Sequence, residues 1–302
     1  MSDDLLDDAR DAARRLFDTG ALGVDDWHDL SWEDRQRLAV DVTMLATALR
    51  EAGPRPSEVD DHLDGPGADA VRTQLGSPTG EVHLQPIVRL PGRQIVGYEA
   101  LSRFPAWAPD LWFRRAWAAG LGLEFEIAAV ARAVDNLRSL PDNAFLGINV
   151  SASTLVSDVL VDELKHADGR RVVLELTEHE PIRDYSPYCE QIGRLRALGV
   201  RIAIDDVGAG HSSLLHIVQL RPDVIKLDRS LIAGCDGDPI RRVLMQCFVT
   251  LARQAQAALV AEGVETEEEA HLLSASGVRL AQGFLFGAAR QHPVAVSRAA
   301  SQ

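Results

Sequence analysis

Short apolar runs rich in β-branched residues alternate with longer segments of helical spacing from residue 83 onward. The runs cover residues 83–90, 95–101, 144–150, 171–177, 200–206, 224–228, 257–264 and 280–286. Segments such as 155–166, 185–198 and 240–255 are long enough for the crossover helices that parallel strands require. Eight strands alternating with helices predict a (β/α)8 barrel, in which the carboxyl ends of the strands meet on one face.

The first two runs depart from this pattern because only Pro91-Gly92-Arg93-Gln94 separates them. Four residues can close a hairpin but cannot form a parallel crossover. We therefore expect a modified (β/α)8 TIM-like barrel whose first strand is antiparallel to its neighbour.

The first fifty residues carry two amphipathic helical patterns, one from Leu5 to Phe17 and one from Ser31, a candidate N-cap, to Leu49. The stretch 53–80 is rich in Gly, Pro and Asp, with a short helical pattern near Ala68 to Leu75. We predict a small helical region at 1–78, including a linker at about 53–78, followed by a barrel domain at 79–302.

Charge is distributed unevenly along the 302 residues. The net charge is −14, and residues 1–78 contain 18 acidic against 8 basic side chains, which accounts for ten of the fourteen excess negative charges. Such an acidic chain would repel duplex nucleic acid and anionic membranes, so we expect neither as a partner. The three cysteines lack CxxC spacing, and no leader or membrane-spanning run is visible, so we expect a cytoplasmic protein.

Polar side chains close most of the predicted strands: Glu99, Asn149, Glu175, Asp205, Asp206, Lys226, Glu262 and Gln282. Each of them taken alone could be a helix cap or a solvated loop residue. Taken together, they supply the oxygen ligands that suit Mg²⁺ or Mn²⁺, whereas zinc would favour His or Cys. The adjacent carboxylates of Asp205 and Asp206 repel each other unless a cation lies beside them, which also favours a metal site.

Eight segments in order carry a family resemblance over residues 81–290. They are Gln85-Pro86-Ile87-Val88, Glu99-Ala100-Leu101 with Arg103, Gly147-Ile148-Asn149-Val150-Ser151, Leu174-Glu175-Leu176-Thr177-Glu178, the Asp205-Asp206 loop, Ile225-Lys226-Leu227-Asp228-Arg229-Ser230, Ala261-Glu262-Gly263-Val264-Glu265-Thr266 and Gln282-Gly283-Phe284-Leu285-Phe286-Gly287. Together they resemble the EAL family of bacterial cyclic-di-GMP phosphodiesterases.

The resemblance implies hydrolysis of cyclic di-GMP to the linear dinucleotide pGpG with two Mg²⁺ or Mn²⁺ ions. It implies that Lys226 acts on the attacking water, that Glu99, Asp205 and Glu262 also serve catalysis, and that Glu178 braces the loop after Asp206. The implied metal ligands are Glu99, Asn149, Glu175, Asp205, Asp206 and Glu262. The implied substrate-binding residues are Gln85, Leu101, Arg103 and Gln282.

Three positions depart from the family pattern. Val207 stands where the family usually has Phe, His211 stands where Tyr is common, and the stretch 287–290 lacks the frequent proline. A catalytically weak or inactive cyclic-di-GMP receptor that signals through residues 1–78 is therefore the main alternative to the enzyme. The resemblance also implies a homodimer. Residues 1–78 are either a dimerising or solubilising cap or a docking segment for a protein partner.

Overall fold

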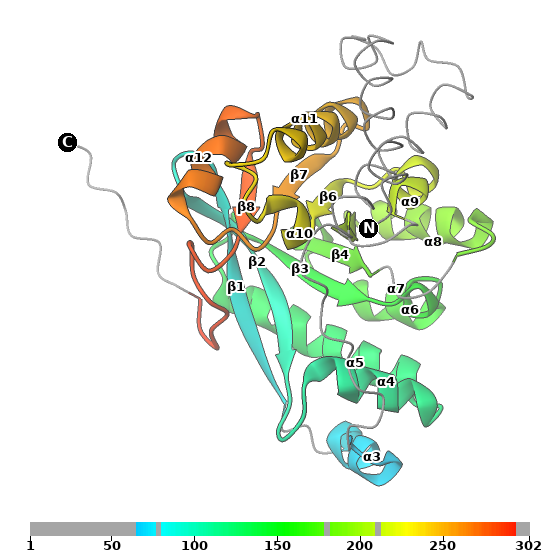
Figure 1. Cartoon of the computed structure of the whole chain (residues 1–302). Coiled ribbons are helices and arrows are strands. Elements are labelled where there is room, and N and C mark those ends of the chain that lie inside the picture. Colours follow the sequence, from blue (N-terminus) through cyan, green and yellow to red (C-terminus); the bar gives the residue numbers. More distant parts are fainter. Residues whose placement is uncertain (1–64, 77–79, 178–181, 209–212, 294–302) are drawn as a thin grey trace, which may run out of the picture. The chain divides into compact units, whose positions relative to one another are not determined.

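The computed structural model describes residues 65–76, 80–177, 182–208 and 213–293 (Figure 1). Its eight strands are β1 (Glu81–Arg89), β2 (Gln94–Arg103), β3 (Phe145–Val150), β4 (Val172–Leu176), β5 (Arg201–Val207), β6 (Val224–Leu227), β7 (Ala258–Ala261) and β8 (Leu280–Gln282). They follow one another in chain order around a closed barrel, which confirms the predicted fold class.

The described residues divide into two compact units. The β1–β4 unit takes residues 65–76, 80–88, 94–177, 182–201 and 287–293. The β5–β8 unit takes residues 89–93 and 202–286.

The hairpin at the start of the barrel matches the expectation from its short connection. β1 and β2 are neighbours in the sheet and are joined by a turn at residues 90–93, so they run antiparallel (Figure 1). From β2 to β4 the pairing is parallel, with Glu99 opposite Gly147 and Asn149 opposite Glu175.

Three helices of the β1–β4 unit share one apolar cluster: α3 (Ala68–Gly76), α4 (Pro109–Ala118) and α5 (Gly122–Asp135). Val71 of α3 is fully buried against Trp112, Ala116 and Phe125. The rings of Trp112 and Phe125 stack with centroids 6.1 Å apart. α3 confirms the short helix predicted near Ala68 to Leu75, and its burial makes it part of the packed unit.

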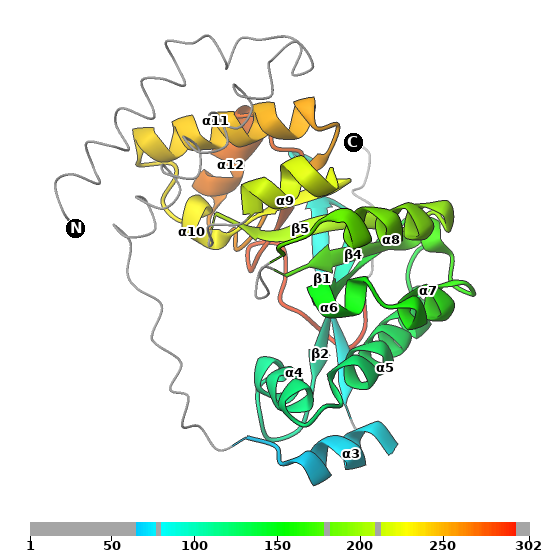
Figure 2. The same ribbon diagram turned by 90° about the vertical axis from the view of Figure 1, so that its right-hand side faces the viewer.

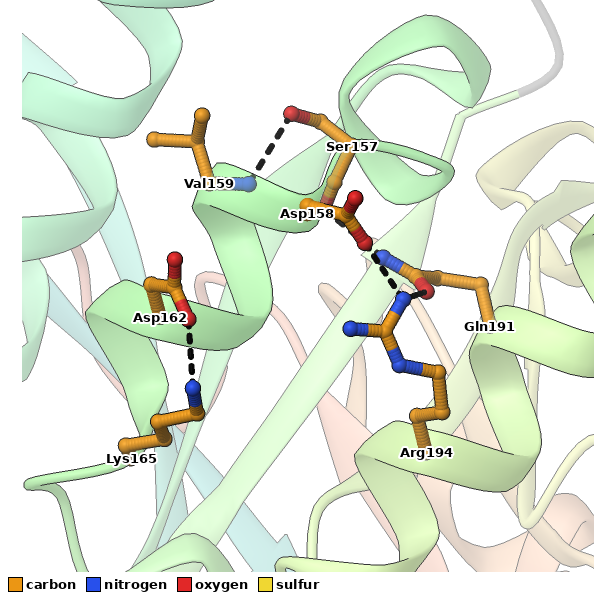
Figure 3. A network of polar contacts seen from close by, with 7 residues as sticks. All are labelled: Ser157, Asp158, Val159, Asp162, Lys165, Gln191 and Arg194. Carbon is orange, nitrogen blue, oxygen red and sulfur yellow. Dashed lines mark hydrogen bonds and ion pairs between the residues drawn. The ribbon is translucent and has the colours of Figure 1, made fainter.

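The segment 155–166, expected to be long enough for a crossover helix, contains one helix and is preceded by a shorter one. α6 (Ala152–Leu155) ends before Ser157, whose hydroxyl accepts a hydrogen bond from the Val159 amide and starts α7 (Asp158–Leu164). Figure 3 shows Arg194 of α8 (Ser186–Ala197) paired with Asp158, while Gln191 donates to the Ser157 carbonyl at 2.7 Å. The side-chain cap breaks the helix because it satisfies an amide that a continuous helix would use internally.

The β5–β8 unit contains α9 (Ser213–Leu220), α10 (Arg229–Ile232), α11 (Pro239–Gln254) and α12 (Glu267–Ala275) (Figure 2). Thr266 and Glu269 form a capping box at the start of α12. β7 and β8 end earlier than the predicted runs 257–264 and 280–286. Gly263 and Gly283 follow their ends with φ of +64° and +157°, values that glycine adopts more readily than other residues.

The helices predicted between Leu5 and Leu49 lie outside the described residues, and the domain boundary near residue 78 stays a prediction. In the ranges that the structure describes, no helix combines the length and the apolar character needed to cross a membrane.

We expect Val71→Ala to lower the free energy of unfolding by about 2 kcal/mol, because it removes two buried methyl groups from the cluster beneath α3. Urea denaturation measures the change. Arg72→Ala, on the exposed side of the same helix, should shift it by less than about 0.5 kcal/mol. Equal effects of the two substitutions would show that α3 does not pack as described.

Candidate functional site

A bulge in β5 determines how the paired aspartates lie. Ile204 pairs with Ile225 and Val207 pairs with Leu227, so the two residues Asp205 and Asp206 stand opposite the single Lys226. Consecutive residues of a regular strand point to opposite faces, whereas a bulge changes the direction of a side chain. Asp206 has a φ of +52°. Oxygen atoms of Asp205, Asp206 and Glu262 consequently lie within 4.8 Å of one another.

Lys226 is buried in this group, with 1% of its side chain exposed. Its Nζ lies 3.0 Å from Asp205 Oδ1 and 2.8 Å from Glu262 Oε1. We call Asp205, Asp206, Lys226 and Glu262 the lysine cluster. Three carboxylates and one ammonium leave two negative charges when all four are ionised, and a divalent cation would balance them.

Arg229 holds the loop that follows Glu262. Its Nη1 donates to the Gly263 carbonyl at 3.0 Å, and its guanidinium forms an ion pair with Glu265. A hydrogen bond to Glu265 raises the pKa of Arg229. The Glu262 amide donates to the Leu227 carbonyl at 3.0 Å, so the ends of β6 and β7 stay in register.

The end of β8 is joined to the same loop. The Val264 amide donates to the Gln282 carbonyl at 3.0 Å, and the Leu285 amide donates to the Val264 carbonyl at 3.1 Å. Gln282, 5% exposed, is therefore placed beside the loop that begins at Glu262.

The β1–β4 unit brings together Glu99, Asn149 and Glu175, which we call the amide cluster. Glu99 and Glu175 are 6% and 1% exposed. Asn149 Nδ2 donates to Glu99 Oε1 at 2.9 Å, which fixes the orientation of the amide. Asn149 Oδ1 is buried and has no hydrogen-bond partner among the described residues. A buried, unsatisfied amide oxygen beside two carboxylates fits a cation that prefers oxygen ligands.

Gly147 makes room for Glu175. A Cβ atom at this position would lie 2.1 Å from Glu175 Oε1, far inside van der Waals contact. The carboxylate thus lies directly over the glycine backbone of the neighbouring strand. Glycine inside a strand is the sequence signal that could have revealed this approach.

Two of the four predicted substrate-binding residues, Leu101 and Arg103, lie close to the amide cluster. Leu101, Arg103 and Asn149 line a pocket of about 120 Å³, together with Phe113 of α4 and other residues. Arg103 Nη1 donates to the Ser102 carbonyl at 2.9 Å. Gln85 instead donates to the Gly287 carbonyl at 3.4 Å.

Two of the singled-out residues, Glu178 and His211, lie outside the described residues. Val207, at the position where the resemblance implies an aromatic residue, is fully buried at the end of β5. The bulge itself and the contacts of Gly147 were not predicted.

Comparison with known proteins identifies the family. The family model described as "EAL domain" matches residues 68–289. This chain therefore belongs to the EAL domain family.

Individual relatives agree with this assignment. "Cyclic di-GMP phosphodiesterase NbdA" of Pseudomonas aeruginosa is 31% identical over 72% of this chain and 30% of the relative. The PaMucR phosphodiesterase in complex with c-di-GMP is 29% identical, with a TM-score of 0.66 over 74% of this chain and 96% of the other. Klebsiella pneumoniae BlrP1, in a manganese/cy-diGMP complex, is 28% identical, with a TM-score of 0.64 over 85% and 67% of the two chains. The chain spans about a third of the length of the first curated relatives it matches.

Replacing Lys226 with methionine should lower the free energy of unfolding by about 3 kcal/mol, because two largely buried carboxylates lose their counter-charge. Chemical denaturation without added metal measures this loss. Lys165→Met removes an exposed lysine paired with Asp162 and should change stability by less than about 1 kcal/mol (Figure 3). A Lys226→Met protein as stable as the parent would contradict the described pairing.

Gly147→Ala should destabilise the protein by about 1–3 kcal/mol, because the added methyl group displaces the Glu175 carboxylate. The matched control is Gly193→Ala in α8, where an added Cβ meets no atom within 4 Å. This control should raise stability by up to about 1 kcal/mol through helix propensity. Thermal unfolding of both variants measures the two changes in stability. A Gly147→Ala protein as stable as the parent would contradict the close approach of Glu175 to Gly147.

Proposed function

We propose that this chain is a metal-dependent phosphodiesterase that hydrolyses cyclic di-GMP to linear pGpG and so lowers the level of this second messenger. The observation that carries the proposal is the lysine cluster, in which the bulge places Asp205 and Asp206 with Glu262 around a buried Lys226. Membership of the EAL domain family and the names of the relatives support the choice of substrate.

Two Mg²⁺ or Mn²⁺ ions are the proposed cofactors. The six proposed ligands are Glu99, Asn149, Glu175, Asp205, Asp206 and Glu262. All of them offer oxygen atoms, and the buried Asn149 Oδ1 provides an acceptor of the kind that these ions bind. When bound, such ions lower the pKa of a coordinated water and neutralise charge on a phosphodiester.

Lys226 is the proposed catalytic cation. Asp205 and Glu262 hold its ammonium group in a fixed place, so it acts without the reorganisation that an exposed lysine would need. It orients the attacking water and stabilises negative charge that develops at the phosphate. Glu99, Asp205 and Glu262 contribute to catalysis by holding the reacting groups.

Substrate binding is assigned to Gln85, Leu101, Arg103 and Gln282. Arg103 is the residue suited to a phosphate oxygen, because its planar guanidinium can donate two parallel hydrogen bonds. Leu101 adds an apolar wall to the pocket that both residues line.

Three further proposals concern Glu178, the assembly of the barrel domain and the N-terminal region. Glu178 braces the loop after Asp206, and residues 79–302 form the phosphodiesterase domain in a cytoplasmic homodimer. Residues 1–78 form an acidic helical region that regulates the domain or docks a protein partner.

The alternative is a cyclic-di-GMP receptor with weak or no turnover. Val207 favours it, because a smaller side chain replaces an aromatic anchor at the loop that follows the two aspartates. The two functions differ in whether the bound nucleotide is released intact.

The deciding experiment incubates the purified chain with cyclic di-GMP and Mg²⁺ or Mn²⁺, with a chelator as control, and separates the products by chromatography. The enzyme produces the linear dinucleotide only with metal, whereas the receptor releases intact cyclic di-GMP. Glu99→Ala should reduce turnover at least about 100-fold. Glu124→Ala, which removes an exposed carboxylate from α5, should leave turnover unchanged. Full turnover by Glu99→Ala would refute the assigned ligands.

A further inference from the structure

Glu126 is a buried carboxylate that the proposed reaction does not use. It lies on α5 and is 7% exposed. Charged side chains are rarely buried to this extent unless they have partners. Glu126 Oε1 accepts a hydrogen bond from Trp117 Nε1 at 2.7 Å, and Oε2 accepts one from the backbone amide of Ser151 at 3.0 Å.

The contact with Trp117 depends on Gly122, the first residue of α5. A Cβ atom at Gly122 would lie 2.0 Å from Cδ2 of the indole, so the ring packs directly on the helix backbone. Residues four apart share a face of a helix, and Glu126 is therefore within reach of the indole N–H above Gly122. This contact occupies Oε1 of Glu126, while Oε2 accepts the hydrogen bond from the Ser151 amide.

Ser151 immediately follows β3, two residues after Asn149. Its hydroxyl accepts a hydrogen bond from the Thr154 amide at 3.2 Å and caps α6. Its own amide donates to Glu126. The backbone at the end of β3 is thus held from both sides, by α5 and by α6.

We propose that Glu126 is a positioning residue that fixes the end of β3 and thereby the orientation of the Asn149 amide. Its consequence for metal binding and turnover rests on the proposed function. The carboxylate suits the role because a charged acceptor makes a stronger hydrogen bond to a backbone amide than a neutral one. Asn149 then keeps its Nδ2 on Glu99 and its Oδ1 available to a cation.

A simpler role would be to join α4 to α5 through Trp117 alone. The two roles are separable because each carboxylate oxygen has its own partner. Trp117→Phe removes the indole donor and retains an aromatic ring over Gly122. Glu126→Gln keeps the size of the side chain, but its NH₂ group cannot accept a hydrogen bond, so one of the two donors loses its partner.

The first readout is the side-chain NH₂ signal of Asn149 in the full-length protein labelled with ¹⁵N-asparagine. The sequence contains only Asn136, Asn143 and Asn149, so Asn149→Ser identifies the signal by its loss. Glu126→Ala, which removes both acceptor oxygens, should shift or broaden it. Trp117→Phe and the exposed-site control Glu124→Gln should leave it in place. An unchanged signal in both Glu126 variants would overturn the proposal, and so would equal shifts in Trp117→Phe and Glu126→Ala.

The second readout is Mn²⁺ affinity, measured by calorimetry on the same proteins. Loss of a residue that orients a ligand typically weakens metal binding about 10–100-fold, so Glu126→Ala should fall in this range while Trp117→Phe binds as the parent does. Parental Mn²⁺ affinity in both Glu126 variants would overturn the link to metal. If the parent itself binds no Mn²⁺, the proposed function fails, whereas the positioning of Asn149 is still decided by its NH₂ signal.

Discussion

A buried ammonium between carboxylates sets the strictest requirement in the β5–β8 unit. Lys226 can stay charged at 1% exposure only if Asp205 and Glu262 remain within ion-pair distance. The bulge in β5 meets this requirement and also directs Asp206 toward the same group. The hydrogen bonds from Arg229 to Gly263 and from Val264 to Gln282 then hold the adjoining loop. The same backbone conformation in β5 thus balances the charge on Lys226 and brings the three carboxylates together.

The β1–β4 unit positions its buried polar side chains through different interactions. Its amide cluster contains no lysine, and its geometry depends on a missing side chain at Gly147 and on the hydrogen bond from Asn149 to Glu99. Glu126 adds a tie to the backbone after β3. Here the geometry of the three polar side chains depends in part on Gly147 and Glu126, neither of which belongs to the amide cluster.

The apolar pattern was sufficient to place all eight strands and to recognise the hairpin at 90–93. It was less accurate at element ends. The run 280–286 contains only the three-residue strand β8, and the segment 155–166 contains a helix break at Ser157. Periodicity reports which side chains are buried, but a change of backbone direction after a strand or a side-chain cap hardly alters that pattern.

The sequence alone determined the fold class and the chemical character of the strand ends, because burial follows local periodicity and carboxylate and amide groups are visible as residue types. Tertiary structure decided which of these groups meet. Asp205 and Asp206 lie near Glu262 through a bulge in β5, and Glu126 reaches Ser151 across 25 residues of chain. Such contacts depend on strand register and on helix packing against the sheet, and neither leaves a repeating signal in the sequence.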